Sequence, residues 1–347
     1  MTAQERRLRL GLIGCGAIAK EHLAALRRIS GIELVAVCDV NRKAALRVGE
    51  EWGANCYGDP GEMMANENLS LVSILTPPQT HSSIAVEAIT RGVNLLVEKP
   101  LAMSSREATE ILKSLSGSKV KLTVNYNWLL SRKMMEALSI MKAGRIGDVL
   151  HVGITILHTP EDEMASNENH WSHKLPGGRF GEMLAHPVYL AQSVLGDELK
   201  VDRIVAAKRG NLAWMRWDEL FGQLHNSNGV ASVYISFNAP RPEIGLVIFG
   251  ARRILQIDLL NQTLIQLGPR TLSKMDSARD CFGISINLAY QAIQNSLVYL
   301  ARRRGESALQ LVYESIAKSI TDGGDPIVTA AVAYDTVKIV EDICSRL

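Results

Sequence analysis

The sequence predicts an α/β protein in which a doubly wound parallel sheet is followed by an α+β domain with a large open, mostly antiparallel sheet. The length of 347 residues is enough for two domains at roughly 150 residues each. Short apolar runs alternate with amphipathic stretches in the first part of the chain, as in a parallel sheet covered on both faces. Later runs alternate apolar and polar residues one by one, as in antiparallel strands with one covered face.

The predicted boundary divides the chain into a first domain of residues 1–125 and a second of residues 126–347, with a last helix able to pack back on the first domain. Strands are predicted at Leu8–Ile13, Glu33–Cys38, Leu71–Leu75, Asn94–Val97 and Lys121–Asn125. Helices are predicted at Ala17–Ile29, Ser83–Arg91 and Ser105–Leu115. Ser104 with Glu107 three residues later predicts a capping box for the third helix.

The second domain shows period-two strands joined by short polar turns. His151, Gly153 and Thr155 fall on one face of a strand whose other face is apolar. Further predicted features are a hairpin at Asn226–Gly229 into Val230–Phe237, strands at Gly245–Phe249 and Arg253–Leu260, and a turn at Asn261–Gln262. Helices are predicted at Lys133–Ala143, Glu182–Leu195 and Cys281–Arg303.

Composition excludes several classes of partner. Lys and Arg total 38 and Asp and Glu total 36, so a net charge of +2 gives no strong field for nucleic acid or an anionic membrane. The five cysteines are Cys15, Cys38, Cys56, Cys281 and Cys344. Their odd number, wide spacing and lack of a C-x-x-C pair favour neither a disulfide scaffold nor a cysteine metal site. We therefore expect a cytoplasmic protein without metal, nucleic-acid or membrane partners.

A glycine-rich turn follows the first predicted strand and opens the first helix. It has the G-x-G-x-x-A spacing, at Gly14, Gly16 and Ala19. Gly14 permits the tight turn, Gly16 lets the backbone approach a pyrophosphate at the helix N-terminus, and Ala19 allows close helix packing. The predicted cofactor contacts in this turn are Gly14, Gly16, Ala17 and Ile18. The alternative is a tight turn without a ligand.

Asp39 ends the second predicted strand, twenty residues after Ala19. A carboxylate there accepts hydrogen bonds from both adenosine ribose hydroxyls and repels a 2′-phosphate. The sequence thus favours NAD over NADP, although the nearby Arg42 weakens that preference. Two more strands end in Thr76-Pro77-Pro78 and in Glu98-Lys99-Pro100, at the sheet edge where ligands bind in such folds.

These residues resemble the glucose–fructose oxidoreductase, inositol dehydrogenase and MocA (Gfo/Idh/MocA) family. The matching pieces are Gly14-x-Gly16-x-x-Ala19, Asp39, Thr76-Pro77-Pro78-x-x-His81, Ala88-x-x-x-Gly92, Glu98-Lys99-Pro100, Gly177-Gly178 with Glu182-x-x-x-His186, and Asp322–Pro326. The resemblance is close in the first domain and looser in the second. It implies an NAD(P)-dependent oxidoreductase of sugars, inositol or related polyols. It adds Thr76, Pro77, His81, Glu98 and Lys99 to the cofactor contacts, with a Lys99–Pro100 bond that is often cis.

The resemblance also implies the catalytic residues Lys99, His186 and Glu182. Oxidation of a carbinol needs a base, and a histidine titrates near neutrality. Glu182 lies four residues before His186, on the same face if the segment is helical, and Lys99 could hold the reacting oxygen. The chain departs from the family at three places. Glu182 replaces the usual Asp, and Leu184 replaces a Gly. The segment Asn127-Trp-Leu-Leu130 stands where the family has a segment with an arginine.

The predicted substrate contacts are Lys99, Tyr126, Asn127, Trp171, His173 and His186. Trp171 and His173 could line the pocket or belong to an ordinary surface loop. The predicted function is hydride transfer between NAD and a sugar, polyol or related small molecule, with a nucleotide-linked or acidic substrate left open. The alternatives are an NAD-recycling glycoside hydrolase and a non-catalytic dinucleotide-binding sensor. The resemblance also implies a homodimer or homotetramer formed through the second sheet.

Overall fold

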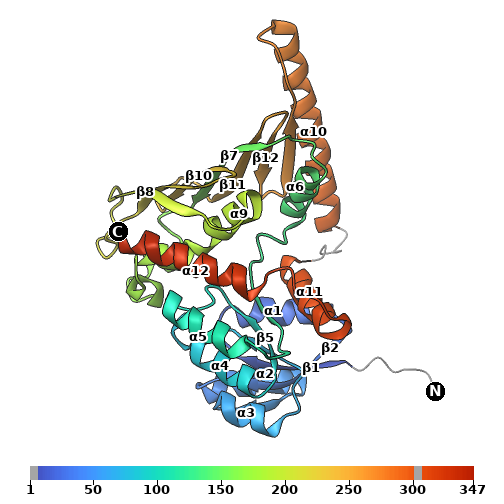
Figure 1. The fold of residues 1–347 in the computed structure, drawn as a ribbon, viewed down its shortest axis with the longest axis vertical. Coiled ribbons are helices and arrows are strands. Elements are labelled where there is room, and N and C mark those ends of the chain that lie inside the picture. The colour runs from blue at the N-terminus through green and yellow to red at the C-terminus, as the bar shows by residue number, and fades with distance from the viewer. Residues whose placement is uncertain (1–6, 301–306) are drawn as a thin grey trace, which may run out of the picture. The chain divides into compact units, whose positions relative to one another are not determined.

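The computed structural model describes residues 7–300 and 307–347 (Figure 1). Its contacts divide the chain into two compact units, and each unit is made of two separate segments of the sequence. The first unit comprises Met1–Asn127 and Glu306–Lys338, and the second comprises Trp128–Gly305 and Ile339–Leu347. One unit contains a parallel sheet and the other a mostly antiparallel sheet, so the predicted fold class is confirmed.

The sheet of the first unit has six parallel strands in the order β3-β2-β1-β4-β5-β6. These strands are β1 (Leu8–Ile13), β2 (Ile32–Cys38), β3 (Asn55–Tyr57), β4 (Leu71–Ile74), β5 (Asn94–Val97) and β6 (Leu122–Val124). Five of them coincide with the predicted strands to within one residue at each end. The strand order reverses between β1 and β4, where a crevice opens at the carboxyl edge of such a sheet.

The helices of the first unit are α1 (Ala19–Leu26), α2 (Arg42–Trp52), α3 (Pro60–Asn66), α4 (His81–Thr90), α5 (Ser105–Leu115) and α11 (Ala308–Asp322), with the 3-10 turn η1 (Pro78–Thr80). Helix α1 is shorter at both ends than the predicted Ala17–Ile29. The Ser104 side chain accepts from the Glu107 N–H, as predicted for α5. The Glu107 carboxylate accepts from Met103 N–H rather than completing the capping box at Ser104.

The segment that returns to the first unit fills part of its core. Tyr313 on α11 is fully buried, and its hydroxyl lies 2.9 Å from both His22 Nδ1 and Ser73 Oγ. Thr123 on β6 donates a hydrogen bond to the Val328 carbonyl. Helix α12 (Ala330–Ser345) begins in the first unit, and its residues from Ile339 onward belong to the second.

The sheet of the second unit has seven strands in the order β13-β12-β11-β7-β10-β9-β8. They are β7 (Val149–Leu157), β8 (Lys200–Ala207), β9 (Glu219–Asn226), β10 (Gly229–Ser236), β11 (Glu243–Gly250), β12 (Ile254–Asp258) and β13 (Thr263–Leu267). Every pairing is antiparallel except that of β7 with β10. Asn226 pairs with Gly229, which confirms the predicted hairpin.

One face of this sheet is covered and the other is open. Val152, Ile154 and Ile156 of β7 are buried, as the alternation predicted, and helix α9 packs on β7 and β10. The remaining elements are α6 (Arg132–Lys142), α7 (Glu163–Ser166), the 3-10 turn η2 (Trp171–Lys174), α8 (Arg179–Met183), α9 (Ala185–Leu195) and α10 (Lys274–Leu300).

Helix α10 begins seven residues before the predicted Cys281–Arg303, whose last three residues lie outside the described part of the chain. Within residues 7–300 and 307–347, no helix is both long and apolar enough to cross a membrane.

Candidate active site

The glycine turn between β1 and α1 has two glycines with different physical roles. Gly14 has a φ of +101°, and a Cβ there would lie 2.8 Å from the backbone carbon of Leu75 on the neighbouring strand end. Only glycine fits such a position. A Cβ on Gly16, in contrast, would meet no atom within 4 Å. The turn is therefore closed towards the sheet at Gly14 and open at Gly16.

Asp39 is held at the end of β2 by two backbone N–H groups. Its Oδ2 accepts from Cys15 N–H at 2.7 Å, and its Oδ1 accepts from Asn41 N–H at 2.7 Å. The carboxylate is thus oriented against the middle of the glycine turn, and its contact with a ribose stays a prediction. Burial, followed by the nearby Asp39 charge, raises the pKa of Cys15 to about 12, so this thiol stays protonated.

The turn fits a dinucleotide. Gly16 and Ala17 are exposed and Ile18 is half-exposed in the segment leading to α1, while Ala19 is buried against the sheet. No side chain among the described residues caps the α1 N-terminus. Uncapped N–H groups beside an open glycine can take a phosphate, and Asp39 stands where a ribose would follow.

The loop after β4 is held by His81, which is fully buried. Its Nδ1 lies 2.8 Å from the Pro100 carbonyl and its Nε2 lies 2.8 Å from the Thr76 carbonyl. Burial lowers the pKa of His81, although the two carbonyls oppose that effect. His81 thus joins the Thr76-Pro77 loop to the loop after β5, and this geometry favours a positioning role over direct contact with the cofactor.

The loop after β5 carries Glu98, Lys99 and a cis Lys99–Pro100 peptide bond, as the resemblance implied. Glu98 is buried, and its Oε1 accepts from His22 Nε2 at 2.8 Å and from Asn125 Nδ2 at 2.5 Å. Burial alone would raise the pKa of Glu98. The hydrogen bond and charge of His22, followed by Asn125 and Lys99, outweigh burial and place the pKa below its usual value. A buried carboxylate therefore anchors the loop that presents Lys99.

His186 lies in the second unit, in the first turn of α9, and two aromatic side chains hold its ring. The Trp128 ring stacks on the imidazole, with centroids 3.8 Å apart and planes at 18°. The Tyr189 hydroxyl lies 2.7 Å from His186 Nδ1. Pro187 falls in the first turn of α9, where the missing N–H costs little. The ring is thus fixed in orientation, with Nδ1 engaged by Tyr189.

Glu182 lies on the short helix α8, and His186 lies on the next helix, α9. The single helix predicted for Glu182–Leu195 is thus two helices, which meet at Leu184, and the first of them begins at Arg179. The buried Glu182 carboxylate forms an ion pair with the buried Arg179 guanidinium. Arg179 also lies 3.6 Å from Asp162, which in turn lies 3.2 Å from His158 Nδ1. The hydrogen bond from His158 lowers the pKa of Asp162 more than its burial raises it. Glu182 therefore belongs to a buried charge network.

The predicted substrate residues lie in different surroundings. Tyr126 is fully buried in the first unit, and burial raises the pKa of its hydroxyl despite a hydrogen bond with Thr336. Its burial disfavours a direct role in substrate binding. Asn127 is half-exposed, and Trp171 is 36% exposed in η2. His173 lines a cavity of about 290 Å³ in the second unit, beside Arg179, Trp214 and Trp217.

Sequence reasoning missed Trp128, Tyr189 and Arg179. Tyr189 follows His186 by three residues on a helix and Arg179 precedes Glu182 by three, a spacing that puts side chains on one face. That spacing is the signal by which these two residues could have been found. Trp128 has no such signal, because it reaches His186 from a segment distant in the chain. Lys99 and His186 belong to different units.

The open glycine turn, the oriented Asp39 and the lysine loop at one edge of a parallel sheet define the first unit as a dinucleotide-binding domain. The chain belongs to the Gfo/Idh/MocA family of oxidoreductases. Residues 8–126 match the family model described as an oxidoreductase family with an NAD-binding Rossmann fold. Residues 134–256 match the Gfo/Idh/MocA C-terminal domain. The predicted family, with NAD as its cofactor, is confirmed.

Individual relatives are more distant. An inositol 2-dehydrogenase from Rhizobium meliloti is 30% identical over 191 residues, covering 55% of this chain and 56% of the relative. A D-apiose dehydrogenase from Paraburkholderia graminis is 30% identical over 147 residues, covering 42% of this chain and 39% of the relative. These matches therefore span about half of the length of these relatives, or less.

A solved structure shows the same fold over nearly the whole chain. The WlbA dehydrogenase from Bordetella pertussis, in complex with NADH and UDP-GlcNAcA, has a TM-score of 0.80 and 18% identity. The similarity covers 99% of this chain and 96% of that one. At this identity it supports the fold.

Proposed function

We propose that the protein transfers a hydride between NAD and a carbinol or carbonyl of a sugar, a polyol or a related small molecule. The observation that carries this proposal is the placement of the open glycine turn and the Lys99 loop. Both lie at the carboxyl edge of one parallel sheet, after β1 and β5. A dinucleotide site and a fixed cation at one edge serve redox chemistry on an oxygen-bearing carbon.

The chain's own residues divide the work of binding and proton transfer. Gly16 and the α1 N-terminus would hold the diphosphate, and Asp39 the adenosine ribose. When bound, NAD supplies the acceptor for the hydride that leaves the carbinol carbon. The Lys99 ammonium would stabilise the negative charge that develops on the substrate oxygen as its proton departs.

We assign the proton of the substrate hydroxyl to His186 Nε2. In the oxidation direction, Nδ1–H donates to the Tyr189 hydroxyl oxygen and Nε2 accepts the proton, so the imidazole becomes imidazolium. The carbinol thereby loses one hydride and one proton and becomes a carbonyl, and the reverse path returns both. Trp128 restrains the ring by stacking, and the Glu182–Arg179 pair fixes the helix turn that precedes it.

The first test is cofactor binding by calorimetry, followed by turnover with a panel of sugars and polyols. NAD(H) should bind more tightly than NADP(H), because Asp39 repels a 2′-phosphate. Lys99→Met should lower kcat by about 10² or more while leaving the melting temperature unchanged. Lys113→Met, at an exposed position on α5, serves as the matched control and should change neither. Absence of dinucleotide binding, or an unchanged kcat in Lys99→Met, would falsify the proposal.

Substrate contacts are proposed for Asn127, Trp171 and His173 beside the two assigned catalytic groups. For His173 the support is the cavity that it lines with Trp214 and Trp217, because an indole face suits the apolar face of a sugar ring. Burial lowers the pKa of His173, and the positive charge of Arg179 adds to this effect. Hydrogen bonds with backbone groups oppose the shift but do not reverse it. A neutral His173 can both donate and accept a hydrogen bond.

We also propose a cytoplasmic homo-oligomer formed through the open face of the second sheet. The part-exposed Phe221 and Tyr234 lie opposite one another on β9 and β10, and Phe249 lies on the same face of β11. All five cysteines are free thiols, which suits a reducing compartment. Phe221→Glu should weaken self-association measured by sedimentation, and an unchanged association constant would remove this face from the interface.

A further inference from the structure

Helix α10 lies outside both segments that match the family, the second of which ends at residue 256. It runs for 27 residues, from Lys274 to Leu300. In Figure 1 the N-terminal part of α10 extends beyond the strands of its own sheet. A helix of this length gains most of its stability from packing one face against a partner.

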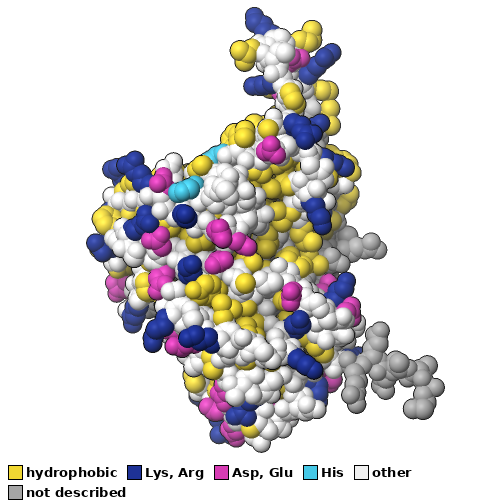
Figure 2. Space-filling view, in the orientation of Figure 1, with side chains coloured by type: hydrophobic (Ala, Val, Ile, Leu, Met, Phe, Trp, Pro, Cys, Tyr) yellow, Lys and Arg dark blue, Asp and Glu magenta, His cyan; other side chains and the backbone are white. Residues whose placement is uncertain are grey.

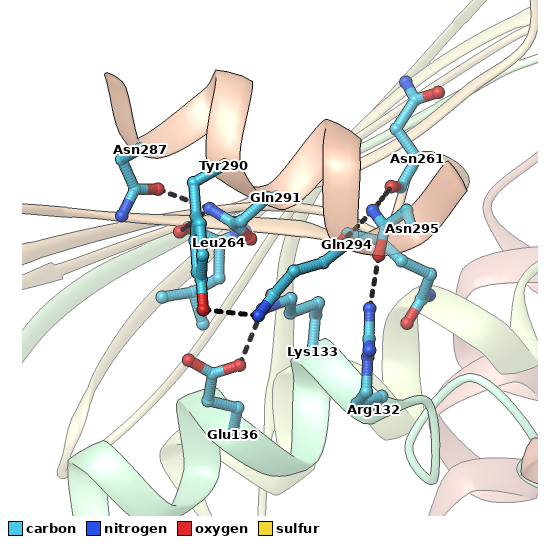
Figure 3. A network of polar contacts seen from close by, with 11 residues as sticks. Arg132, Lys133, Glu136, Asn261, Leu264, Asn287, Tyr290, Gln291, Gln294 and Asn295 are labelled. Atoms are coloured by element: carbon cyan, nitrogen blue, oxygen red, sulfur yellow. Dashed lines mark hydrogen bonds and ion pairs between the residues drawn. The ribbon is translucent and has the colours of Figure 1, made fainter. Parts of the chain in front are cut away.

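The packed face of α10 is polar. The Gln291 side chain makes two hydrogen bonds of 2.9 Å, one with the N–H and one with the carbonyl of Leu264 on β13. Asn295 donates to the carbonyls of Asn261 and Gln262 in the preceding turn. Figure 3 shows these side chains facing the strand and helix α6. Within residues 274–298 of the helix, Gln291 is the one buried side chain.

The opposite face of α10 is apolar and exposed. It is made of six side chains that are between 54% and 70% exposed, namely Met275, Phe282, Ile286, Tyr290, Ile293 and Leu297. Tyr290 stands at the edge of this face, where it also lines the groove towards Lys133 and Glu136 of α6 and its hydroxyl accepts from Gln294 (Figure 3). We call these six side chains the α10 stripe. Steps of three, four and seven residues place them on one side of the helix, and Gln291 projects from the other. Hydrophobic side chains are visible along the projecting helix in Figure 2.

This arrangement is the reverse of an ordinary surface helix, which buries its apolar face. Each large apolar side chain left in water forgoes the burial free energy that it would gain in a contact. A continuous exposed stripe of this kind marks an interaction surface. The charges nearby are balanced, since Lys274 and Arg279 are matched by Asp276 and Asp280. This gives no excess of positive charge for an anionic membrane surface.

The order of side chains in the α10 stripe identifies its partner. Met275 and Leu297 each lie eleven residues from Ile286, and Phe282 and Tyr290 each lie four residues from it. Arg279 and Ile293 each lie seven residues from Ile286. In a two-fold contact the methylene stem of Arg279 can therefore cover Ile293 of the second copy. A stripe that reads alike in both directions is what a two-fold contact between identical helices requires, because residue i then meets residue j and j meets i.

We propose that α10 packs antiparallel on α10 of a second copy of this chain, with the two-fold axis beside Ile286. The contact pairs Met275 with Leu297 and Phe282 with Tyr290, and it brings the two Ile286 side chains together. It uses a surface different from the open sheet face and does not depend on the enzymatic proposal. Two distinct two-fold contacts on one chain build a closed tetramer of dihedral symmetry when their axes intersect at right angles.

Cross-linking at the axis tests the geometry, because a residue on a two-fold axis lies next to itself in the other copy. In a Cys56→Ser, Cys281→Ser background, Ile286→Cys should give a covalent dimer with a short bismaleimide. Ala292→Cys, exposed on another side of the same helix, is the matched control and should give at least tenfold less. Equal yields at the two positions, or no dimer at 286, would overturn the proposal.

Sedimentation of the full chain tests the energetics. Ile286→Glu should weaken association at least tenfold with an unchanged far-ultraviolet spectrum, whereas Ser285→Glu should not. The sheet variant Phe221→Glu measures the other contact, so failure of either interface can be told apart from failure of the other. A monomeric wild-type chain, or one whose α10 stripe binds phosphatidylcholine vesicles instead of a second copy, would also overturn the proposal.

Discussion

At the scale of single residues, the surroundings of His186 matter more than its identity. Trp128 covers one face of the imidazole, and the Tyr189 hydroxyl contacts Nδ1 at 2.7 Å. Tyr189 is itself buried, so its hydroxyl has little freedom to leave that contact. A general base is efficient when its ring is held in one orientation and one tautomer, with the other nitrogen directed to the substrate.

Tyr189→Phe tests this positioning role, because it keeps the aromatic ring and removes only the hydroxyl. Loss of one hydrogen bond to an ionisable ring should lower kcat by about tenfold, from roughly 1.5 kcal/mol at 1.36 kcal/mol per decade. The acid limb of the kcat profile should move to lower pH, since the hydroxyl oxygen accepts from the protonated ring. KM should stay within about twofold.

A second substitution separates positioning from general loss of stability. Tyr57→Phe removes a hydroxyl that bonds Glu67 in the first unit, and it should leave the pH profile unchanged. If Tyr189→Phe lowers the melting temperature without moving the acid limb, Tyr189 is a packing residue only.

At the scale of elements, the β1–α1 turn separates folding from binding within three residues. Gly14 is closed in by Leu75 and has a positive φ, whereas Gly16 faces open space. Gly14→Ala should lower the free energy of unfolding by about 1–3 kcal/mol, through backbone strain and the clash at 2.8 Å. Gly16→Ala should leave stability unchanged and weaken NAD binding at least tenfold, because its Cβ occupies the space that the diphosphate backbone needs.

Thermal unfolding and calorimetric titration of the two variants provide the measurements. The proposal predicts opposite patterns, with a stability defect in Gly14→Ala and a binding defect in Gly16→Ala. Unaltered NAD affinity in Gly16→Ala would show that the cofactor does not approach this turn.

The elements that sequence reasoning predicted well are those whose own residues determine them. β1 and β5 are apolar runs with clear boundaries, and α5 has its own cap at Ser104. β3 was not predicted, because three residues form a strand only by pairing with β2. The early start of α10 was missed, because the residues from Lys274 to Asp280 are mostly polar and show no apolar pattern.

The site divides in the same way. The glycine turn, Asp39 and the Lys99 loop could be predicted, since each follows a strand at the sheet edge. The partners of the predicted residues could not, because Arg179 meets Asp162, and Trp128 meets His186, across long stretches of sequence. Burial of Tyr126 and the clamp made by His81 also depend on tertiary packing.

At the scale of the whole molecule, the two units do not follow the order of the chain. Residues from Glu306 to Lys338 belong to the same unit as residues 1–127. Tyr313 joins α1 and β4 through its hydroxyl, and Ile316 on the same helix is fully buried. We propose that the first unit requires this returning segment in order to fold. A fragment of residues 1–127 should therefore show no cooperative unfolding transition.

Tyr313→Ala tests this dependence in the full-length chain. Removal of a buried aromatic side chain should cost about 3–5 kcal/mol, and it also leaves His22 and Ser73 without their shared partner. Hydrogen exchange measured by mass spectrometry should rise in α1, β1 and β4, and should stay unchanged in β7, β10 and β11. Leu246→Ala, at a buried position of β11, is the matched control and should give the reverse pattern. Equal increases in both sheets after Tyr313→Ala would contradict the assignment, because they would show that the returning segment stabilises the chain as a single cooperative body.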